Sequence, residues 1–275
     1  MSDRPYLKDS ALGHATQYTD QLDASVLFPI ARSDARAELS LSAWPYAGAD
    51  VWYAYELSWL APSGLPKVAL ARLTLPAHSP HLVESKSLKL YLNTYAMTVF
   101  ADRQAVQRQL ELDLSAAAGA PVAVALFDVN AGLWREPQPE WICLDTLAVH
   151  TTEYVVNPSL LALQDRAEVV TQTLYSHLLR SNCPVTAQPD WGTVVVAYTG
   201  PCIDPAALLR YIVSYRTHTG FHEQCVERIF RDILGLATFS DLRVQAHYLR
   251  RGGLDINPWR ALNESAPDMG RWPRQ

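Results

Sequence analysis

The stretches LKLYLNTY (residues 88–95) and LLRYIVSY (residues 208–215) decide how this sequence is organised. They are separated by an offset of 120 residues and carry leucine and tyrosine at matching positions. The matched pairs are Leu88 with Leu208, Tyr91 with Tyr211, and Tyr95 with Tyr215. A repeated unit determines the architecture of a chain, so repeats are sought before any element is assigned. The match predicts that the chain contains one structural unit twice.

The same offset continues without a gap into a second pattern further along each copy. In the first stretch, Leu88, Tyr91, Leu92 and Tyr95 recur at the i, i+3, i+4 and i+7 spacing of one helix face. The second pattern matches Gln104, Val106, Arg108 and Leu114 with Gln224, Val226, Arg228 and Leu234. A constant offset across two successive helical patterns predicts a duplicated pair of helices.

Strand patterns flank these helices in both copies. In the first copy, VWYAYELSWL (51–60) and KVALARLTLP (67–76) surround the turn APSGLP, and PVAVALFDV (121–129) follows the helices. In the second copy, GTVVVAYTG (192–200) precedes the helices and LRVQAHYL (242–249) follows them. We therefore expect an α+β protein of two tandem β-β-α-α-β units, with antiparallel sheets and the helices on one face.

The predicted domains are residues 1–150 and residues 151–275. The stretch of about 130–165 between the copies contains prolines and broken periodicity, as in LWREPQPEW and VVNPSLLAL, and is interpreted as an insertion or linker. With 275 residues, of which 49% are hydrophobic, the chain can bury a core in each domain.

Composition narrows the class of function. The net charge of −5 argues against broad electrostatic binding of nucleic acid and favours a small-molecule substrate. The first 17 residues, MSDRPYLKDSALGHATQ, have no apolar signal core, and no stretch reaches the ~18 apolar residues of a membrane span. We expect a soluble, cytoplasmic protein with no membrane partner, whose four cysteines stay reduced.

The stretch SNCPVTAQPDW (181–191) places Cys183 just ahead of a strand and Asp190 near its start. The turn between them can fold the two side chains toward one another. A carboxylate disfavours a thiolate by its charge, so Asp190 would more plausibly transfer a proton than stabilise an anion. The alternative is that Cys183 is a small buried hydrophobe and Asp190 caps a turn.

The stretch FHEQCVERIF (221–230) carries a histidine and a glutamate at a helix start. His222 lies at the end of the apolar face, and Glu223 lies in the first turn, where the helix dipole favours its ionised form. Both are also ordinary in a structural helix. His222 and Cys225 form an HxxC, so a zinc site completed by Cys183 or Cys202 is a further alternative.

Two other stretches suit an anion. In SPHLVESKSLKLY (79–91), a helix start with two lysines three residues apart favours a phosphate, although a capped, solvated turn would have the same pattern. In RRGGLDINPW (250–259), paired arginines precede paired glycines, which is also typical of a glycine-rich strand exit. The chain has no GxGxxG and no GxxxxGK[ST], so neither common nucleotide-binding mode is supported.

Taken together, ESKSLKLYLN, SNCPVTAQPDWG, FHEQCVERIF and RRGGLDINPW resemble the motifs of a known family. It is that of the bimodular, NADPH-dependent 7-cyano-7-deazaguanine reductases, the nitrile reductases of the queuosine pathway of tRNA modification. The resemblance covers the chain from about residue 80 onward. It implies the tunnelling fold shared with GTP cyclohydrolase I, and it implies catalysis without a metal.

The resemblance also implies a mechanism. Cys183 would add to the nitrile to give a covalent thioimide, and two NADPH would reduce it to the aminomethyl product. Asp190 would be the proton donor, assisted by His222. The residues implied to bind the free deazaguanine base are Val83, Glu84, Ser85, His222 and Glu223. The residues implied to bind NADPH are Ser85, Lys86, Arg251 and Gly252.

The two copies divide these residues between them. Glu84, Ser85 and Lys86 fall in the first copy and the others in the second, so we expect composite sites and a homodimer. The negative charge fits a free base and not a tRNA as substrate. Two alternatives remain from the sequence: a zinc-dependent cyclohydrolase of the same fold, and a non-catalytic purine- or pterin-binding module in which Cys183 only packs.

Overall fold

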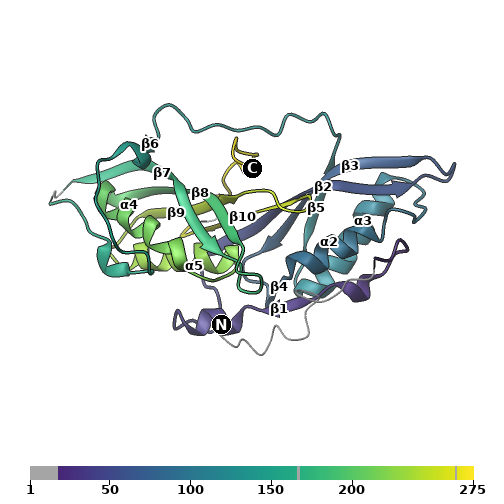
Figure 1. Cartoon of the computed structure of the whole chain (residues 1–275), viewed down its shortest axis with the longest axis horizontal. Coiled ribbons are helices and arrows are strands. Elements are labelled where there is room, and N and C mark those ends of the chain that lie inside the picture. The colour runs from purple at the N-terminus through teal and green to yellow at the C-terminus, as the bar shows by residue number, and fades with distance from the viewer. Residues whose placement is uncertain (1–17, 166–167, 264) are drawn as a thin grey trace. The chain divides into compact units, whose positions relative to one another are not determined.

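The computed structural model of the chain describes residues 18–165, 168–263 and 265–275 (Figure 1). The prediction that the first 17 residues carry no signal core therefore lies outside the described residues. The chain forms two compact units. Unit 1 comprises residues 1–43, 50–132 and 250–255, and unit 2 comprises residues 44–49, 133–249 and 256–275.

Unit 1 contains an antiparallel sheet with two helices beside it (Figure 1). Its strands lie in the order β5-β3-β2, and β3 and β5 pair from Leu70 opposite Phe127 to Thr74 opposite Ala123. Helix α3 packs against β5 and also against β4, which pairs with β1 in a separate two-stranded sheet. The elements are β1 (Pro29–Ala31), α1 (Ser33–Ala37), β2 (Ala47–Leu60), β3 (Pro66–Pro76), β4 (His81–Val83), α2 (Ser85–Asn93), α3 (Arg103–Ala118) and β5 (Ala123–Phe127).

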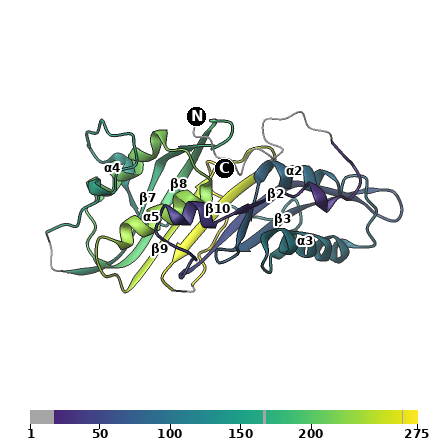
Figure 2. The same cartoon turned by 90° about the horizontal axis from the view of Figure 1, so that it is seen from below.

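Unit 2 repeats this plan, with two strands ahead of a pair of helices and a strand after them (Figures 1 and 2). Its strands lie in the order β10-β9-β8-β7-β6, and all these pairings are antiparallel except β6 with β7. Helix α4 packs on β7, and α5 packs on β9. The elements are β6 (Ile142–Cys143), β7 (Val169–Asn182), β8 (Pro189–Pro201), α4 (Pro205–Ser214), α5 (His222–Leu234), β9 (Asp241–Tyr248) and β10 (Leu254–Ala261).

Short 3-10 helices fill the connections. They are η2 (Ala24–Val26), η3 (Leu144–Thr146), η4 (Pro158–Leu160) and η5 (Tyr215–Thr217). The insertion predicted at 130–165 holds only η3, η4 and the two-residue β6 as regular structure. No helix in the described part of the chain is long and apolar enough to cross a membrane.

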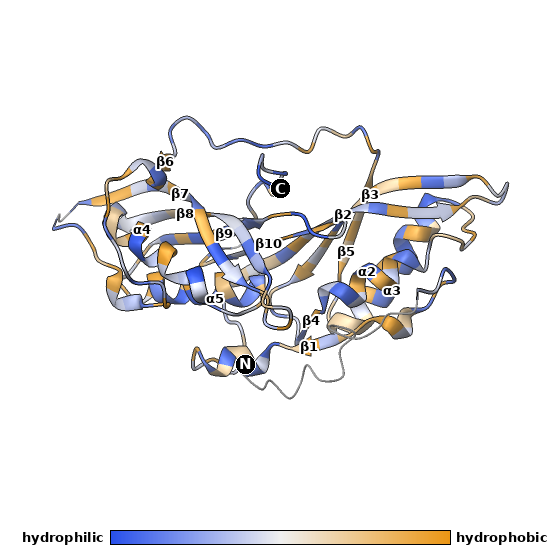
Figure 3. Cartoon of the chain, viewed as in Figure 1, coloured by the Kyte–Doolittle hydropathy of each residue, from blue (hydrophilic) through white to orange (hydrophobic). Residues whose placement is uncertain are grey.

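The period of the apolar residues explains why each element forms. Along β3, Ala69, Ala71, Leu73 and Leu75 are buried at every second position. Along α3, Val106, Leu110, Leu114 and Ala118 are buried at every fourth position, and most of the other residues are polar (Figure 3). Gly119 ends α3 at φ 69°, in the left-handed conformation that glycine adopts without strain.

The structure confirms the duplicated unit down to its hydrogen bonds. The Tyr91 hydroxyl lies 2.6 Å from that of Tyr95 and donates to Asp113 at 2.6 Å. In unit 2 the Tyr211 hydroxyl lies 2.9 Å from that of Tyr215 and donates to Asp232 at 2.6 Å. The N-caps also correspond, because Glu84 caps α2 and Asp204 caps α4 at the same offset of 120. Both copies therefore tie their helix pair together in the same way.

The compact units differ from the predicted division at residue 150. The chain passes from one unit to the other after Gly132, and two short segments cluster with the opposite unit from the one expected. Residues 44–49 belong to unit 2, where Trp44 and Tyr46 pack against Phe230 of α5 at 5.7 and 5.1 Å between ring centroids. Residues 250–255 belong to unit 1, where Gly253 accepts a hydrogen bond from the Tyr55 amide of β2.

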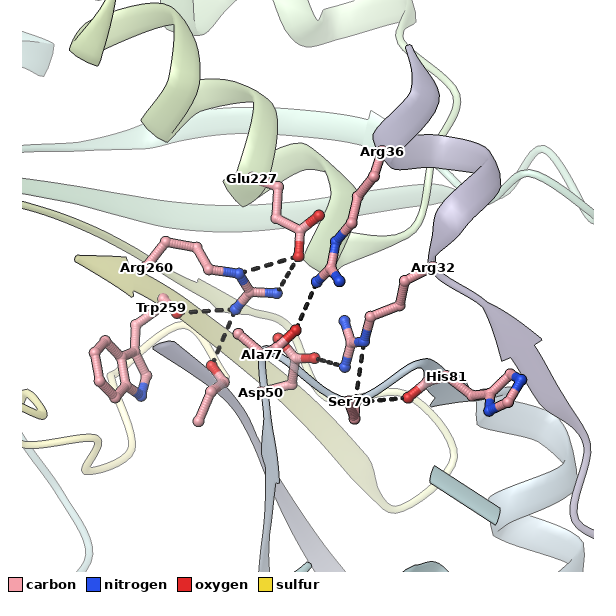
Figure 4. A network of polar contacts seen from close by, with 10 residues as sticks. Arg32, Arg36, Asp50, Ala77, Ser79, His81, Glu227, Trp259 and Arg260 are labelled. Carbon is pink, nitrogen blue, oxygen red and sulfur yellow. Dashed lines mark hydrogen bonds and ion pairs between the residues drawn. The ribbon is translucent and has the colours of Figure 1, made fainter. Parts of the chain in front are cut away.

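Each unit contains buried charged side chains that hydrogen-bond to one another (Figure 4). In unit 1, the Arg32 guanidinium donates to Asp50 at 2.5 Å and to Ser79 at 3.2 Å. In unit 2, Arg260 donates from two nitrogens to one Glu227 oxygen, at 2.8 and 3.2 Å. Arg260 is fully buried and also donates to the Trp259 carbonyl. Loss of a hydrogen bond between buried charges is costly, so these pairs constrain the segments that carry them.

Candidate functional site

Cys183 lies half-buried in the loop between β7 and β8. Its amide donates to the Gln188 carbonyl at 2.9 Å, and its carbonyl accepts from the Ala187 amide at 3.1 Å. Ala187 has φ 55°, the left-handed conformation that closes the loop. The strands pair up to Asn182 opposite Pro189, so the loop holds Cys183 at the end of a rigid hairpin.

Asp190 and His222 meet in unit 2 as one acid–imidazole pair. Asp190 is on β8 and is 2% exposed, and the first residue of α5, His222, places Nε2 3.6 Å from an Asp190 oxygen. Backbone hydrogen bonds bring the Cys183 loop to the same place, because Asn182 donates to His218 and accepts from Gly220. The structure thus joins the residue before Cys183 to the segment that leads into α5.

Glu223 occupies the first turn of α5 and is 2% exposed. The helix begins at Phe221, whose amide donates to the Gln224 side chain at 3.2 Å. A buried carboxylate at this end of a helix is stabilised by the dipole and can accept two hydrogen bonds from a planar donor edge. The predicted residues Cys183, Asp190, His222 and Glu223 therefore gather at one end of the unit 2 sheet.

Cys225 is fully buried on the same helix, and burial raises the pKa of its thiol to about 12. The nearby hydroxyls of Ser181 and Tyr248 act in the opposite direction, whereas Asp190 and Glu223 raise the pKa further. A thiol of this kind stays protonated and is a poor metal ligand. Among the residues that the structure describes, no group of three His, Cys, Asp or Glu is arranged to hold a metal ion.

In unit 1, Glu84 acts as the N-cap of α2. Its two oxygens accept from the amides of Lys86 and Ser87, both at 2.7 Å. The carboxyl is fully buried, and that burial raises its pKa although both amides and Lys89 lower it. The two amides that could have bound a phosphate are thus occupied by Glu84, and Lys86 and Lys89 are the cationic side chains of this helix start.

A pocket of about 310 Å³ lies beside α2 in unit 1. Lys86, Lys89, Glu56 and Gly252 are among its lining residues. A Cβ atom at Gly252 would lie 3.0 Å from the Lys89 side chain, so glycine permits the close approach of the lysine. The structure therefore brings the predicted cofactor residues Lys86 and Gly252 together.

The stretch RRGG forms the tight turn between β9 and β10. Arg251 and Leu254 exchange backbone hydrogen bonds at 2.8 and 3.2 Å across it. Gly252 has φ 56° and Gly253 has φ 75°, which is the signature of a two-residue type I′ turn. The alternative interpretation of RRGG, a glycine-rich strand exit, thus describes its backbone, and anion binding by Arg251 and Gly252 stays a prediction.

Other predicted residues lie at the edges of these groups. Ser85 follows the cap on α2, with its hydroxyl 3.4 Å from a Glu84 oxygen. Val83 ends β4 and is 1% exposed, so its side chain belongs to the core.

One neighbour of the site was not predicted from the sequence. The ring centroid of Tyr248 lies 4.0 Å from that of His222, whereas the pattern LRVQAHYL indicates only that Tyr248 lies on a strand.

Two family profiles match the chain. The profile for "Nitrile reductase, 7-cyano-7-deazaguanine-reductase N-term" matches residues 18–126, and that for "QueF-like protein" matches residues 189–267. Together with the antiparallel α+β units and the motifs of unit 2, they define a nitrile reductase built from two related modules.

The relatives make the family definite. A Burkholderia lata protein named NADPH-dependent 7-cyano-7-deazaguanine reductase is 52% identical over 269 residues, 97% of this chain and 98% of its own. One of the same name from Burkholderia ambifaria is 54% identical over 270 residues, with the same coverage. The apo structure of the archaeosine synthase QueF-Like has a TM-score of 0.31 and 16% identity, covering 38% of this chain and 100% of its own. The chain belongs to the family of NADPH-dependent 7-cyano-7-deazaguanine reductases.

Proposed function

We propose that this chain reduces the nitrile of 7-cyano-7-deazaguanine to an aminomethyl group with two NADPH, through a thioimide on Cys183, as a step of queuosine biosynthesis. The observation that carries the mechanism is the 3.6 Å contact between Asp190 and His222, together with the hydrogen bonds of Asn182 to the segment that leads into α5. Family membership supports the substrate and the cofactor.

The first step adds the Cys183 thiol across the carbon–nitrogen triple bond. Sulfur bonds to carbon, and the thiol proton is transferred to nitrogen, so that nothing is expelled. Asp190 is buried beside the imidazole of His222, and the two groups can receive the thiol proton and deliver it to the nitrogen. When bound, NADPH would supply one hydride to this carbon in each of two reductions, and Asp190 and His222 would pass two protons from solvent to the nitrogen. Between these transfers the carbon–sulfur bond breaks and Cys183 is regenerated.

Glu223 is proposed to recognise the base. A carboxylate accepts from both a ring N–H and an exocyclic amine, and the position of Glu223 one residue after His222 places this acceptor next to the acid–imidazole pair. Glu84, Ser85 and the Val83 main chain are proposed as further contacts to the base, since they flank the start of α2.

The residues of unit 1 fit an anionic cofactor. Lys86 and Lys89 line a pocket together with the glycine turn at Gly252, and a turn without side chains lets the phosphates of NADPH approach the backbone. Ser85 and Arg251 adjoin the same two segments and are proposed to complete the NADPH site. We further propose a cytoplasmic homodimer that binds the free base and no nucleic acid.

The test is mass spectrometry of the protein mixed with the nitrile base without NADPH. The wild-type chain should gain the full mass of the base at Cys183, whereas Cys183→Ala should gain nothing and should not oxidise NADPH. Asp190→Asn should lower the reduction rate by ~10²–10⁴, as loss of a general acid does. Cys225→Ala is the matched control and should still form the adduct. A label on another cysteine, or turnover by Cys183→Ala, overturns the proposal.

A further inference from the structure

Tyr248 lies where the strands of unit 2 face the start of α5. It is the last residue of β9 and pairs with Gly192 of β8. Because side chains alternate along a strand, Gly192 shares its face with Asp190, two residues earlier. Tyr248 therefore belongs to the same patch of sheet as the acid, and it is 1% exposed.

The Tyr248 ring contacts the imidazole of His222 directly. The ring centroids are 4.0 Å apart and the planes meet at 67°, an edge-to-face arrangement. His222 also lies 3.6 Å from Asp190. The imidazole thus contacts both a carboxylate and an aromatic ring of the same patch of sheet, and its side chain is 16% exposed.

Gly192 makes room for this ring. A Cβ atom at that position would lie 3.1 and 3.3 Å from two ring carbons of Tyr248 and 3.3 Å from the His247 carbonyl. Few side-chain atoms approach so closely, so any other residue would displace the ring toward His222 or deform the strand pair. The glycine of the PDWG stretch therefore has a steric role that is separate from the chemistry of Asp190.

Contacts on the far side keep the ring in place. The Tyr248 hydroxyl lies beside the buried Cys225 thiol, which comes from α5, one turn after His222. The Tyr248 carbonyl accepts from the Gln275 side chain at 2.9 Å. The buried hydroxyl has no hydrogen-bond partner among the described residues, so packing against α5 and the backbone of β9 are what hold the ring.

We propose that Tyr248, accommodated by Gly192, is a positioning residue that holds the His222 imidazole against Asp190. The inference rests on the proposed function for its effect on turnover. A histidine at the first position of a helix has two free side-chain torsions, and a 3.6 Å contact with Asp190 alone does not select one rotamer. Packing against a rigid ring removes this freedom before substrate binds.

Tyr248→Leu and Tyr248→Phe separate the ring from its hydroxyl. We expect Tyr248→Leu to lower the rate of NADPH oxidation at saturating base by about tenfold or more, and Tyr248→Phe to stay within about threefold of wild type. In a His222→Asn background, Tyr248→Leu should add less than about twofold, because a residue that acts through another has no effect once that partner is gone. Additive losses would overturn the proposal.

Side-chain mobility tests the same idea independently of catalysis. Carbon-13 relaxation of the His222 ring should show a rigid imidazole in wild type and Tyr248→Phe, and nanosecond motion in Tyr248→Leu. If the His222 ring is equally rigid in Tyr248→Leu, Tyr248 does not position it. Full activity in His222→Asn would instead contradict the proposed role of His222 in turnover, and the relaxation result would still decide the role of Tyr248.

Unit 2 provides a matched control. Phe239 lies over Gly200 of β8 and contacts Tyr198 edge-on at 5.6 Å, the same arrangement without a site residue. A Cβ atom at Gly200 would lie 2.5 Å from the Phe239 ring, which is a tighter clash than at Gly192. Gly192→Ala should increase the mobility of the His222 ring and slow turnover. Gly200→Ala should do neither, when both variants are compared per amount of folded protein. Equal effects on the His222 ring would contradict the inference.

Discussion

Two cysteines of unit 2 differ in what surrounds them. Cys183 is half-exposed at the tip of the β7–β8 hairpin, whereas Cys225 is buried under the sheet with a thiol pKa of about 12. Residue type and spacing alone allowed Cys183 to be a nucleophile and Cys225 to be a zinc ligand. A short motif does not show which of the two side chains is buried. The periodicity of α5 did indicate the apolar face, and Cys225 lies on that face with Val226 and Ile229.

Glu84 shows the cost of burying a carboxylate as a helix cap. Burial raises its pKa above the ordinary value of 4.5, so between 4.5 and the raised value the native state binds more protons than the unfolded chain. The free energy of unfolding should therefore fall as pH rises through this interval. Glu84→Gln, which cannot ionise, should make that fall shallower in urea unfolding measured at several pH values. An unchanged slope would show that other groups cause it.

The helix pairs are the elements that the sequence predicted best. A face that repeats every three to four residues is specific to a helix, and both pairs were placed from such faces. The strands were harder. The alternation of VVTQTLYSHLLRSN is interrupted where the β7–β8 register shifts between Ser176 and Leu179, and β7 was not assigned from the sequence. β10 was missed because buried Asp255, Asn257 and Arg260 give it the composition of a polar loop.

The shared tyrosine network gives a prediction for the helix pairs. Tyr211→Phe leaves the half-buried Asp232 carboxylate without its hydroxyl donor, and partial burial already raises the pKa of that carboxyl. The free energy of unfolding should fall by ~1–3 kcal/mol, the penalty for a buried polar group that loses its partner. Tyr91→Phe in unit 1 should behave alike, because Tyr91 makes the same bond to Asp113. Denaturant unfolding of both variants provides the comparison, and a loss in one copy only would contradict the equivalence.

At the scale of the whole chain, the order of the motifs indicated the family correctly. It did not indicate which residues belong to each compact unit. The segment at residues 250–255 follows the second repeat in sequence and clusters with unit 1, because its turn bonds to β2. Local patterns report which element a residue forms and do not report its long-range partners. The same limit applies to the Asp190–His222 pair, which the sequence placed in two separate motifs and the fold brings to 3.6 Å.

The two-residue turn at Gly252 and Gly253 also makes the chain intolerant of a change in length at this point. Adding one residue there would advance β10 by one position and exchange its two faces, so Arg260 would point away from Glu227 and the buried hydrogen bonds between them would be lost. We expect such an insertion to cost ~3–5 kcal/mol of unfolding free energy, whereas one between Glu136 and Pro137, outside any helix or strand, should cost far less. Related proteins should therefore vary in length within the 133–141 segment and keep the same number of residues between β9 and β10. The length of this turn fixes the face of the sheet on which each side chain of β10 lies.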